Sequence, residues 1–244
     1  MNALEVTGLH FSYPDATKVL DGVDFAMAQG ERVALLGPNG AGKTTFVLHL
    51  IGILSGGAGS ISVAGLHLEE GALADIRRRV GLVFQDSDDQ LFMPTVYEDV
   101  AFGPVNFGLT DDLDGRVERA LDAVRMEGAG NRAPHHLSGG ERRRVAVATV
   151  LACEPEILVL DEPSSNLDPA GRRELAEVLE GLDVSILLVT HDLPYALQLC
   201  KRAVVMNHGR IVADGPIADI LSDPEIMAAN RLELPAGFDP QRFR

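Results

Sequence analysis

The sequence is poor in positive charge: its 244 residues include 21 Lys and Arg against 36 Asp and Glu, a formal net charge of −15. Nucleic acids and anionic lipid surfaces are bound by basic patches, so this deficit argues against both as partners. Cysteine is also scarce, because Cys153 and Cys200 are the only two. Two cysteines cannot form a disulfide framework, which favours a reducing compartment, and we assign both to packing.

Long apolar runs are missing as well. No uninterrupted run approaches the roughly 18 residues of a membrane span. The first five residues, Met-Asn-Ala-Leu-Glu, lack the basic and apolar regions of a signal peptide. We therefore expect a soluble, cytosolic protein that acts at a membrane only through a partner.

Short apolar runs, by contrast, recur along the chain and alternate with helical patterns. The apolar runs are continuous and bounded by Gly, Pro or Asp, as is typical of central strands buried on both faces. Strands are expected at residues 32–36, 80–84, 157–160, 186–189 and 203–206, and helices at 42–52, 113–125, 140–151 and 171–182. This alternation predicts an α/β fold with a mostly parallel sheet.

Two regions break the alternation. Residues 3–28 have the pattern of two strands around a turn at Pro14-Asp15, which predicts an antiparallel β flank. Residues 86–153 hold several helical patterns and few strand signals, which predicts an inserted α-helical subdomain. We expect one domain over residues 1–244, with its core at 1–85 and 154–244, because the tail after Pro224 is too short for another.

A phosphate-binding motif follows the first expected core strand. Residues 37–44, Gly-Pro-Asn-Gly-Ala-Gly-Lys-Thr, match G-x-x-x-x-G-K-[ST] between a strand and a helix, the context that the motif requires. Its glycines let backbone N–H groups surround phosphate oxygens. Lys43 brings charge to the β- and γ-phosphates, and the Thr44 hydroxyl can ligate Mg²⁺. The expected ATP-binding residues are Asn39, Gly40, Ala41, Gly42, Lys43, Thr44 and Thr45.

A carboxylate pair, Asp161 and Glu162, directly follows the apolar run 157–160. Ligands of open α/β sheets lie at the carboxyl ends of the strands, where this pair is expected. Asp161 suits Mg²⁺ binding, directly or through a neighbouring ligand, and Glu162 suits a general base that orients the attacking water. Taken alone, such a pair is more often a solvated turn, but the phosphate motif upstream favours ATP hydrolysis.

A third motif, Leu-Ser-Gly-Gly-Glu at residues 137–141, begins an expected helix. Ser138 and Glu141 have the spacing of a capping box, so a helix start would explain both. It would not explain Gly139 and Gly140, which weaken a first helical turn but bare its N–H groups to a ligand.

This pentapeptide resembles the signature motif of ATP-binding-cassette ATPases, and the resemblance covers nearly the whole chain in the family's motif order. It implies a P-loop NTPase (RecA-like) core with the antiparallel flank and the helical insertion. By the same resemblance, Tyr13 stacks on adenine, Gln85 reaches Mg²⁺ and the attacking water, Asp168 lies in the D-loop and His191 contacts the γ-phosphate. Glu141 departs from the family, in which Gln is commonest at that position.

The resemblance also implies a head-to-tail dimer with a second ATPase subunit, and the complete set of motifs favours a second copy of this chain over a paralogue. The residues Ser138, Gly139, Gly140 and Glu141 of one subunit would then cover the γ-phosphate bound by the other, and isolated monomers would hydrolyse poorly. The nearby Arg142, Arg143 and Arg144 point in different directions on a helix, so we expect them on a solvated or interfacial face.

The segment 86–104, after Gln85, resembles ATPases of energy-coupling-factor importers, most of all the cobalt/nickel branch. The similarity rests on Asp-Asp-Gln-Leu-Phe, on Glu-Asp-Val-Ala-Phe-Gly-Pro and on Glu141. It implies integral membrane partners, namely a transmembrane coupling protein and a substrate-binding component, and a peripheral place on the cytoplasmic face of the cell membrane. Alternatively, the strip Leu91, Phe92 and Met93 only packs the insertion.

Three other functions stay open from the sequence. The chain could serve another importer, or an exporter, with a vitamin, lipid or drug as cargo. It could be a soluble cassette ATPase of iron–sulfur cluster assembly, or a regulator that binds nucleotide without hydrolysing it. The last is least favoured, because Glu162 and His191 are both present.

Overall fold

The computed structural model describes residues 2–15 and 18–243, with only the backbone of residue 243. Its main sheet has the strand order β10-β9-β3-β8-β7-β6, and all neighbours are parallel except β10 and β9. The strands are β3 (Arg32–Leu36), β6 (Val80–Val83), β7 (Ile157–Asp161), β8 (Ser185–Val189), β9 (Arg202–Asn207) and β10 (Arg210–Pro216).

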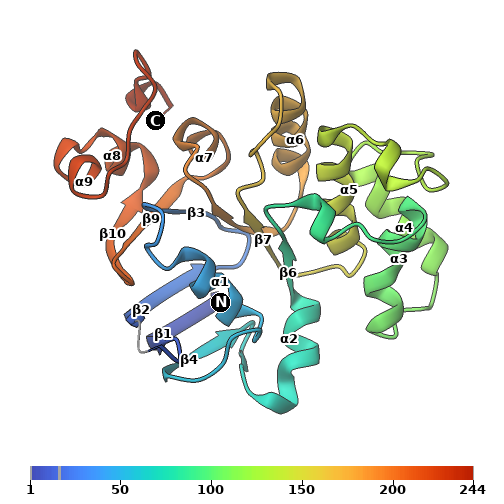
Figure 1. Cartoon of the computed structure of the whole chain (residues 1–244), viewed down its shortest axis with the longest axis horizontal. Helices are drawn as coiled ribbons and strands as arrows, with labels where there is room; N and C mark the ends of the chain where they lie inside the picture. The colour runs from blue at the N-terminus through green and yellow to red at the C-terminus, as the bar shows by residue number, and fades with distance from the viewer. Residues whose placement is uncertain (1, 16–17, 244) are drawn as a thin grey trace.

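A second sheet is antiparallel, with the order β2-β1-β4-β5. Its strands are β1 (Asn2–Ser12), β2 (Lys18–Ala28), β4 (Ala58–Val63) and β5 (Leu66–His67). It lies below the main sheet in Figure 1, together with α1 (Lys43–Leu50). On the other side of the main sheet stand α6 (Pro169–Gly181) and α7 (Leu193–Leu199).

The remaining helices gather at the two ends of the main sheet (Figure 1). Beside β6 are α2 (Leu73–Arg79) and the group α3 (Val96–Asn106), α4 (Leu113–Ala123) and α5 (Gly139–Leu151). Near β10 are α8 (Ile217–Ser222) and α9 (Pro224–Ala229). Short 3-10 turns are η1 (Glu70–Ala72), η2 (Ser87–Asp89), η3 (Pro134–His136) and η4 (Pro240–Phe243). In the described part of the chain, no helix combines the length and apolar character needed to cross a membrane.

The core consists of two apolar clusters on the two faces of the main sheet. In β3, Ala34 and Leu36 join the cluster that includes the helices α3 to α7, whereas Val33 and Leu35 join the cluster of α1 and the antiparallel sheet. Because successive side chains point to opposite faces of a strand, a strand covered on both faces must be apolar throughout. This explains the continuous apolar runs.

The α/β prediction with a mostly parallel sheet is confirmed, and so is the antiparallel flank with its turn at Pro14-Asp15. The five expected strands are present with ends shifted by at most one residue, and the four expected helices with ends shifted by at most two. The sequence patterns missed β4, β5, β10, α2, α3, α7, α8 and α9. Between residues 86 and 153, all of which are described, the structure has helices and no strand.

Candidate functional site

The loop of residues 37–44 connects β3 to α1, and its shape requires glycine. Gly37 has φ 144° and Gly42, the N-cap of α1, has φ 104°. A Cβ on Gly37 would lie 2.0 Å from the Met206 carbonyl oxygen, and one on Gly42 would lie 2.9 Å from that of Val19. Any other residue would therefore push the loop away from β9 and β2. The loop ends at the N-terminus of α1, where free N–H groups attract anions.

The Lys43 side chain is folded back over this loop. Its Nζ donates to the carbonyl oxygens of Gly37 at 2.7 Å and Pro38 at 3.0 Å, and the residue is 9% exposed. Burial lowers the pKa of the Lys43 ammonium, and the carboxylates of Glu162 and Asp161 oppose this shift. A phosphate in the loop would offer the ammonium a stronger partner than the two neutral carbonyls.

Glu162 is held at the carboxyl edge of the sheet by the residues that follow β8. Its Oε2 accepts from the Thr190 hydroxyl at 2.9 Å, and its Oε1 accepts from the His191 N–H at 3.0 Å and lies 2.8 Å from His191 Nδ1. The Glu162 backbone N–H donates to Val189 at 2.8 Å. Asp161 ends β7, and burial raises its pKa, with a further increase from Glu162.

One cavity of about 520 Å³ brings six of the predicted site residues together. Its lining includes the predicted residues Asn39, Thr44, Gln85, Asp161, Glu162 and His191, together with Gly37 and Pro38. The lining also includes Leu193, Arg231, Leu232 and Glu233, which the sequence did not indicate. The segment from Arg231 to Glu233 carries no recognisable motif, and its place here depends on how the tail folds back.

The tail is attached beside the phosphate loop through Asn230 and Leu232. Asn207, at the end of β9, donates through Nδ2 to Asn230 Oδ1 at 2.9 Å, and Asn230 donates through its own Nδ2 to Ile226 at 2.8 Å. Leu232 is 7% exposed and packs in the core. Arg231 lies between these two anchors, with a left-handed φ of 51°.

A second cavity of about 520 Å³ connects the phosphate loop to the start of α5. Thr44, Gln85 and Asp161 line it as well as the first cavity, so these three lie where the two meet. Its other walls come from the segment after β6 (Phe84 and residues 86–89), from Gly139, Arg142 and Arg143 of α5, and from residues 165–167. The shared residues carry hydroxyl, amide and carboxylate oxygens, the ligand types that Mg²⁺ prefers.

The capping box predicted at residues 138–141 is confirmed. Ser138 Oγ accepts from the Glu141 N–H at 3.2 Å, and Glu141 Oε2 accepts from the Ser138 N–H at 2.7 Å. Arg132 also donates to Glu141, at 2.7 Å, and these contacts lower the pKa of Glu141 to about 2. Arg132 therefore balances the negative charge that Glu141 brings to this site.

The signature residues face a third cavity, of about 330 Å³. Ser138, Gly139 and Gly140 line it together with Asn166, Leu167 and Asp168. Asp168 caps α6, because its Oδ1 accepts from the Gly171 N–H at 2.7 Å. Ser138 and Gly140 thus open onto a different space from the one that holds Glu162 and His191.

Tyr13 lies beside α1 and lines neither of the two larger cavities. Its hydroxyl is 3.2 Å from Thr45 Oγ1, and its ring meets that of Phe11 edge-on at 5.1 Å. Tyr13 is 36% exposed, so part of the residue is available to a ligand next to the phosphate loop.

The expectation of a solvated or interfacial face for the three arginines was wrong for two of them. Arg143 and Arg144 are 4% and 9% exposed. Arg143 donates to the carbonyl oxygens of Phe84 at 2.7 Å and Gln85 at 2.6 Å, and Arg144 donates to Glu174 at 2.5 Å. Both sides of α5 are covered here, one by the segment after β6 and the other by α6. The backbone carbonyls of Phe84 and Gln85 lie beyond the end of β6, so they need hydrogen-bond donors from outside the sheet.

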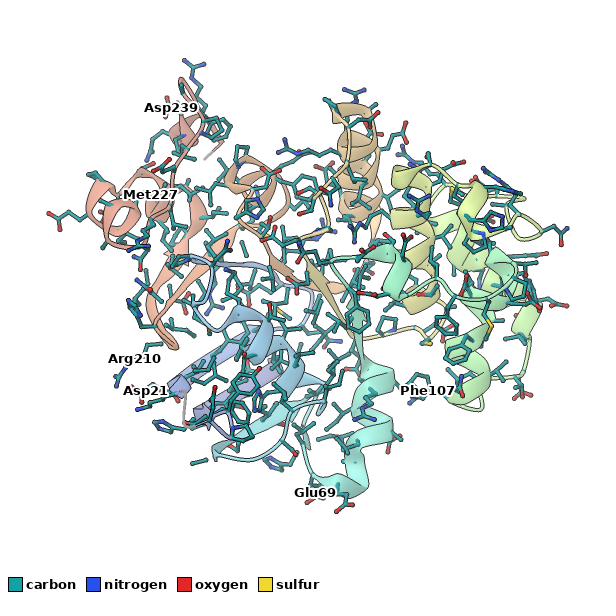
Figure 2. All side chains as sticks on the ribbon, in the orientation of Figure 1. Asp21, Glu69, Phe107, Arg210, Met227 and Asp239 are labelled. Atoms are coloured by element: carbon teal, nitrogen blue, oxygen red, sulfur yellow. The ribbon has the colours of Figure 1, made fainter. Side chains whose placement is uncertain are left out.

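An apolar groove of about 320 Å³ lies between α2, β6 and α3. It is lined by Phe84, Phe102 and Phe107, the last of which Figure 2 labels at the end of α3 that faces α2. At one side Phe92, 60% exposed, meets the half-exposed Phe102 edge-on at 5.0 Å. Packing of the insertion therefore explains Leu91, which is buried, but not Phe92.

Comparisons with known proteins agree with these motifs. A family model described as ABC transporter matches residues 20–165. A putative ABC transporter ATP-binding protein of Streptomyces coelicolor is 65% identical over 99% of this chain and 94% of its own length. The energy-coupling factor transporter ATP-binding protein EcfA of Methanothermobacter thermautotrophicus is 46% identical over 97% of this chain and 78% of its own.

Solved structures are similar in fold over most of the chain. CbiO1 from Clostridium perfringens, described as part of the ABC transporter complex CbiONQ, matches with a TM-score of 0.84 and 36% identity over 96% of each chain. A dimeric ATP-binding cassette bound to ADP and phosphate matches with a TM-score of 0.77 over 88% of this chain and 98% of its own. At 24% identity, that likeness concerns the fold alone.

Proposed function

This chain belongs to the ABC transporter family as its ATP-hydrolysing subunit, and from that premise we propose that it powers an importer of the energy-coupling-factor type, with cobalt or nickel ions as cargo. The observation that carries the proposal is the apolar groove beside Gln85, because its exposed Phe102 and the exposed Phe92 that packs against Phe102 suit a helix of a membrane partner. Relatives named for the energy-coupling factor support the type, and the resemblance of residues 86–104 to the cobalt/nickel branch supports the cargo.

In this proposal Glu162 is the general base. Its carboxylate is fixed by Thr190 and His191, so it can orient a water molecule and accept its proton as the water attacks the γ-phosphate. Lys43 and the loop N–H groups hold the phosphates, His191 contacts the γ-phosphate and Tyr13 lies against the adenine. Thr44, Gln85 and Asp161 would hold Mg²⁺, which neutralises phosphate charge when bound.

We further propose that the working unit is a dimer of two such chains. Ser138, Gly139 and Gly140 open onto a cavity without Glu162, so they suit the γ-phosphate of a second subunit better than that of their own. Glu141 fixes this turn through its capping box, and Asp168 fixes the neighbouring loop. Each ATP would then lie between the loop 37–44 of one chain and the signature of the other.

For the chain as a whole, we propose one domain with core residues 1–85 and 154–244 and a helical insertion at 86–153. The chain would attach peripherally to the cytoplasmic face of the cell membrane. Its groove would receive the transmembrane coupling protein, which in turn would carry the substrate-binding component. Closing of the dimer around two ATP molecules would move the insertion, and with it the membrane partner.

The test is co-expression of this chain with the membrane genes adjacent to it, followed by uptake of labelled cobalt or nickel into cells. We expect ATP-dependent uptake of one of them, abolished in the same complex carrying Glu162→Gln. If neither metal is taken up, the proposed cargo is contradicted, but the assignment as an ATPase is not. Copurification with soluble proteins alone would contradict the importer and favour a cassette ATPase of cluster assembly.

A further inference from the structure

Arg143 is a buried cation that no described carboxylate contacts directly, although the charge of Asp86 partly offsets the lowering of its pKa by burial. It is 4% exposed, and within the described part of the chain it forms no ion pair, whereas its neighbours Arg142 and Arg144 contact Asp88 and Glu174. Its Nε has no hydrogen-bond partner among the described protein atoms. Burying a charge in this way is costly, so an arginine at this place needs a reason beyond filling space.

The two groups that Arg143 does contact are the carbonyls of Phe84 and Gln85, at 2.7 and 2.6 Å. These residues directly follow β6. Phe84 lines both the apolar groove and the cavity that leads to α5, and Gln85 lines both of the larger cavities beside the phosphate loop. One guanidinium therefore fixes the short piece of backbone that joins the groove to the ATP site.

A second side chain ties the same backbone to the same helix. Gln90 accepts through Oε1 from the Phe84 N–H at 3.2 Å. Its Nε2 donates to the Ala146 carbonyl at 2.8 Å and to Thr149 Oγ1 at 2.7 Å, both on α5. Phe84 and Gln85 are thus attached to α5 at two levels, and a shift of α5 must carry Gln85 with it.

We propose that Arg143 is a positioning residue for ATP hydrolysis, which holds Gln85 in the site and makes its place follow the signature helix α5. The proposal rests on the role of Gln85 given above. The first turn of α5 carries Gly139 and Gly140, so Arg143 connects the residues that would face the second subunit to a residue of this chain's own site. A planar guanidinium can donate to two carbonyls in one fixed geometry, which the point charge of lysine cannot reproduce.

The test is a double-mutant cycle between Arg143 and Gln85, measured as phosphate release at one fixed protein concentration. We expect Arg143→Lys to lower kcat about tenfold, because small displacements of a positioning group slow chemistry strongly, while KM for ATP changes less than about twofold. In a Gln85→Ala background, Arg143→Lys should have no further effect. Arg116→Lys, at a partly buried arginine of α4 that lines none of the three cavities, is the control and should leave kcat unchanged.

Thermal melting accompanies each variant, so that loss of fold is not mistaken for loss of positioning. If Arg143→Lys melts below the assay temperature, Arg143→Gln, which keeps an amide donor, replaces it in the cycle. If Arg143→Lys lowers kcat by the same factor in the Gln85→Ala background as in the wild type, the inference is overturned. That result would not contradict the role of Glu162 in ATP hydrolysis. An unchanged kcat in Gln85→Ala would overturn both the inference and the role proposed for Gln85.

Discussion

At the scale of single residues, Glu162 is held unusually firmly for a side chain at a strand end. Its φ of 46° lies in the left-handed region, which few non-glycine residues adopt. The Thr190 hydroxyl and the His191 N–H both donate to its carboxylate. Backbone strain and hydrogen bonds together leave the carboxylate little freedom, as a group that must orient one water molecule requires.

Glu162→Gln should therefore keep the geometry and remove the base. We expect hydrolysis to slow by roughly 100-fold or more, the range of general-base catalysis, with ATP affinity unchanged. With ATP bound, the variant should also remain a dimer, whereas the wild-type dimer should separate quickly after hydrolysis. Phosphate release, equilibrium nucleotide binding and light scattering measure the three quantities. An undiminished rate would show that another group is the base.

The sequence predicted site residues best where the chemistry lies within one motif. The loop 37–44 and the pair Asp161–Glu162 could be predicted because adjacent residues meet one ligand. Thr190 could not, because its contact with Glu162 depends on the pairing of β7 with β8. Arg143 was misjudged for the same reason, since the carbonyls that it binds are 59 and 58 positions away.

At the scale of elements, the capping box of α5 contains an ionised carboxylate, Glu141, that contributes to stability. Arg132 and the Ser138 N–H stabilise the ionised form of Glu141 and hold its pKa near 2, below its ordinary 4.5. A carboxylate whose pKa is lower in the folded state stabilises the fold above the unfolded pKa. That contribution is lost as pH falls from about 4.5 towards 2.

Glu141→Gln keeps an acceptor for Ser138 but removes the ion pair with Arg132. We expect a free energy of unfolding lower by less than about 1 kcal/mol at pH 7, because the pair is partly exposed. The difference from the wild type should shrink as pH falls through 4 towards 2. Urea unfolding across this range checks it, with Glu118→Gln on α4 as control. A difference independent of pH would contradict the ion-pair explanation.

The contact between β6 and α5 requires the absence of a side chain at Gly81. A Cβ there would lie 1.8 Å from Val150 Cγ1. Gly81→Ala should destabilise the protein by about 1–3 kcal/mol, the usual cost of overpacking, because α5 must move away from the sheet. Gly215→Ala is the matched control in β10, where a Cβ meets no atom within 4 Å. Equal unfolding midpoints for both variants would refute this account.

Element prediction failed mainly where local patterns are weak. The edge strand β10 alternates exposed and half-buried residues, so it lacks the continuous apolar run of the central strands. Pro104 interrupts the helical pattern of α3, although the helix begins with a complete capping box at Thr95 and Glu98. The central strands were predictable because burial on both faces imposes an apolar residue at nearly every position.

At the scale of the whole molecule, the tail beyond α9 returns to the cavity lined by Glu162 and His191. Among the described residues that line it, Arg231 is the only one with a permanent positive charge. Its neighbours Asn230 and Leu232 are buried, so the backbone at Arg231 is fixed in place. Asp161, Glu162 and Glu233 also line this cavity, and their negative charges would repel a phosphate ligand. A cation such as Arg231 offsets this repulsion and can donate charge-assisted hydrogen bonds to the phosphate.

Arg231→Ala should therefore weaken ATP binding more than ADP binding, because the cation lines the same cavity as Glu162, where the γ-phosphate is expected. We expect a loss of about 1 kcal/mol for ATP, or roughly fivefold in Kd, and less than about twofold for ADP. Titration calorimetry with both nucleotides measures this. Arg242→Ala, an exposed arginine of the same tail paired with Asp239, is the control. Equal losses for ATP and ADP would exclude a contact with the γ-phosphate.

The position of β3 between β8 and β9 has a consequence for synthesis of the chain. Gly30, just before β3, donates to Ser185 Oγ, 155 positions later, and Leu36 pairs with Val205 of β9. A ribosome needs on the order of ten seconds to translate that distance. During this time the emerging loop 37–44 has no strand on either side of β3. We therefore expect a chain interrupted before β8 to carry the complete loop sequence without the neighbouring strands that hold β3 and its loop in place.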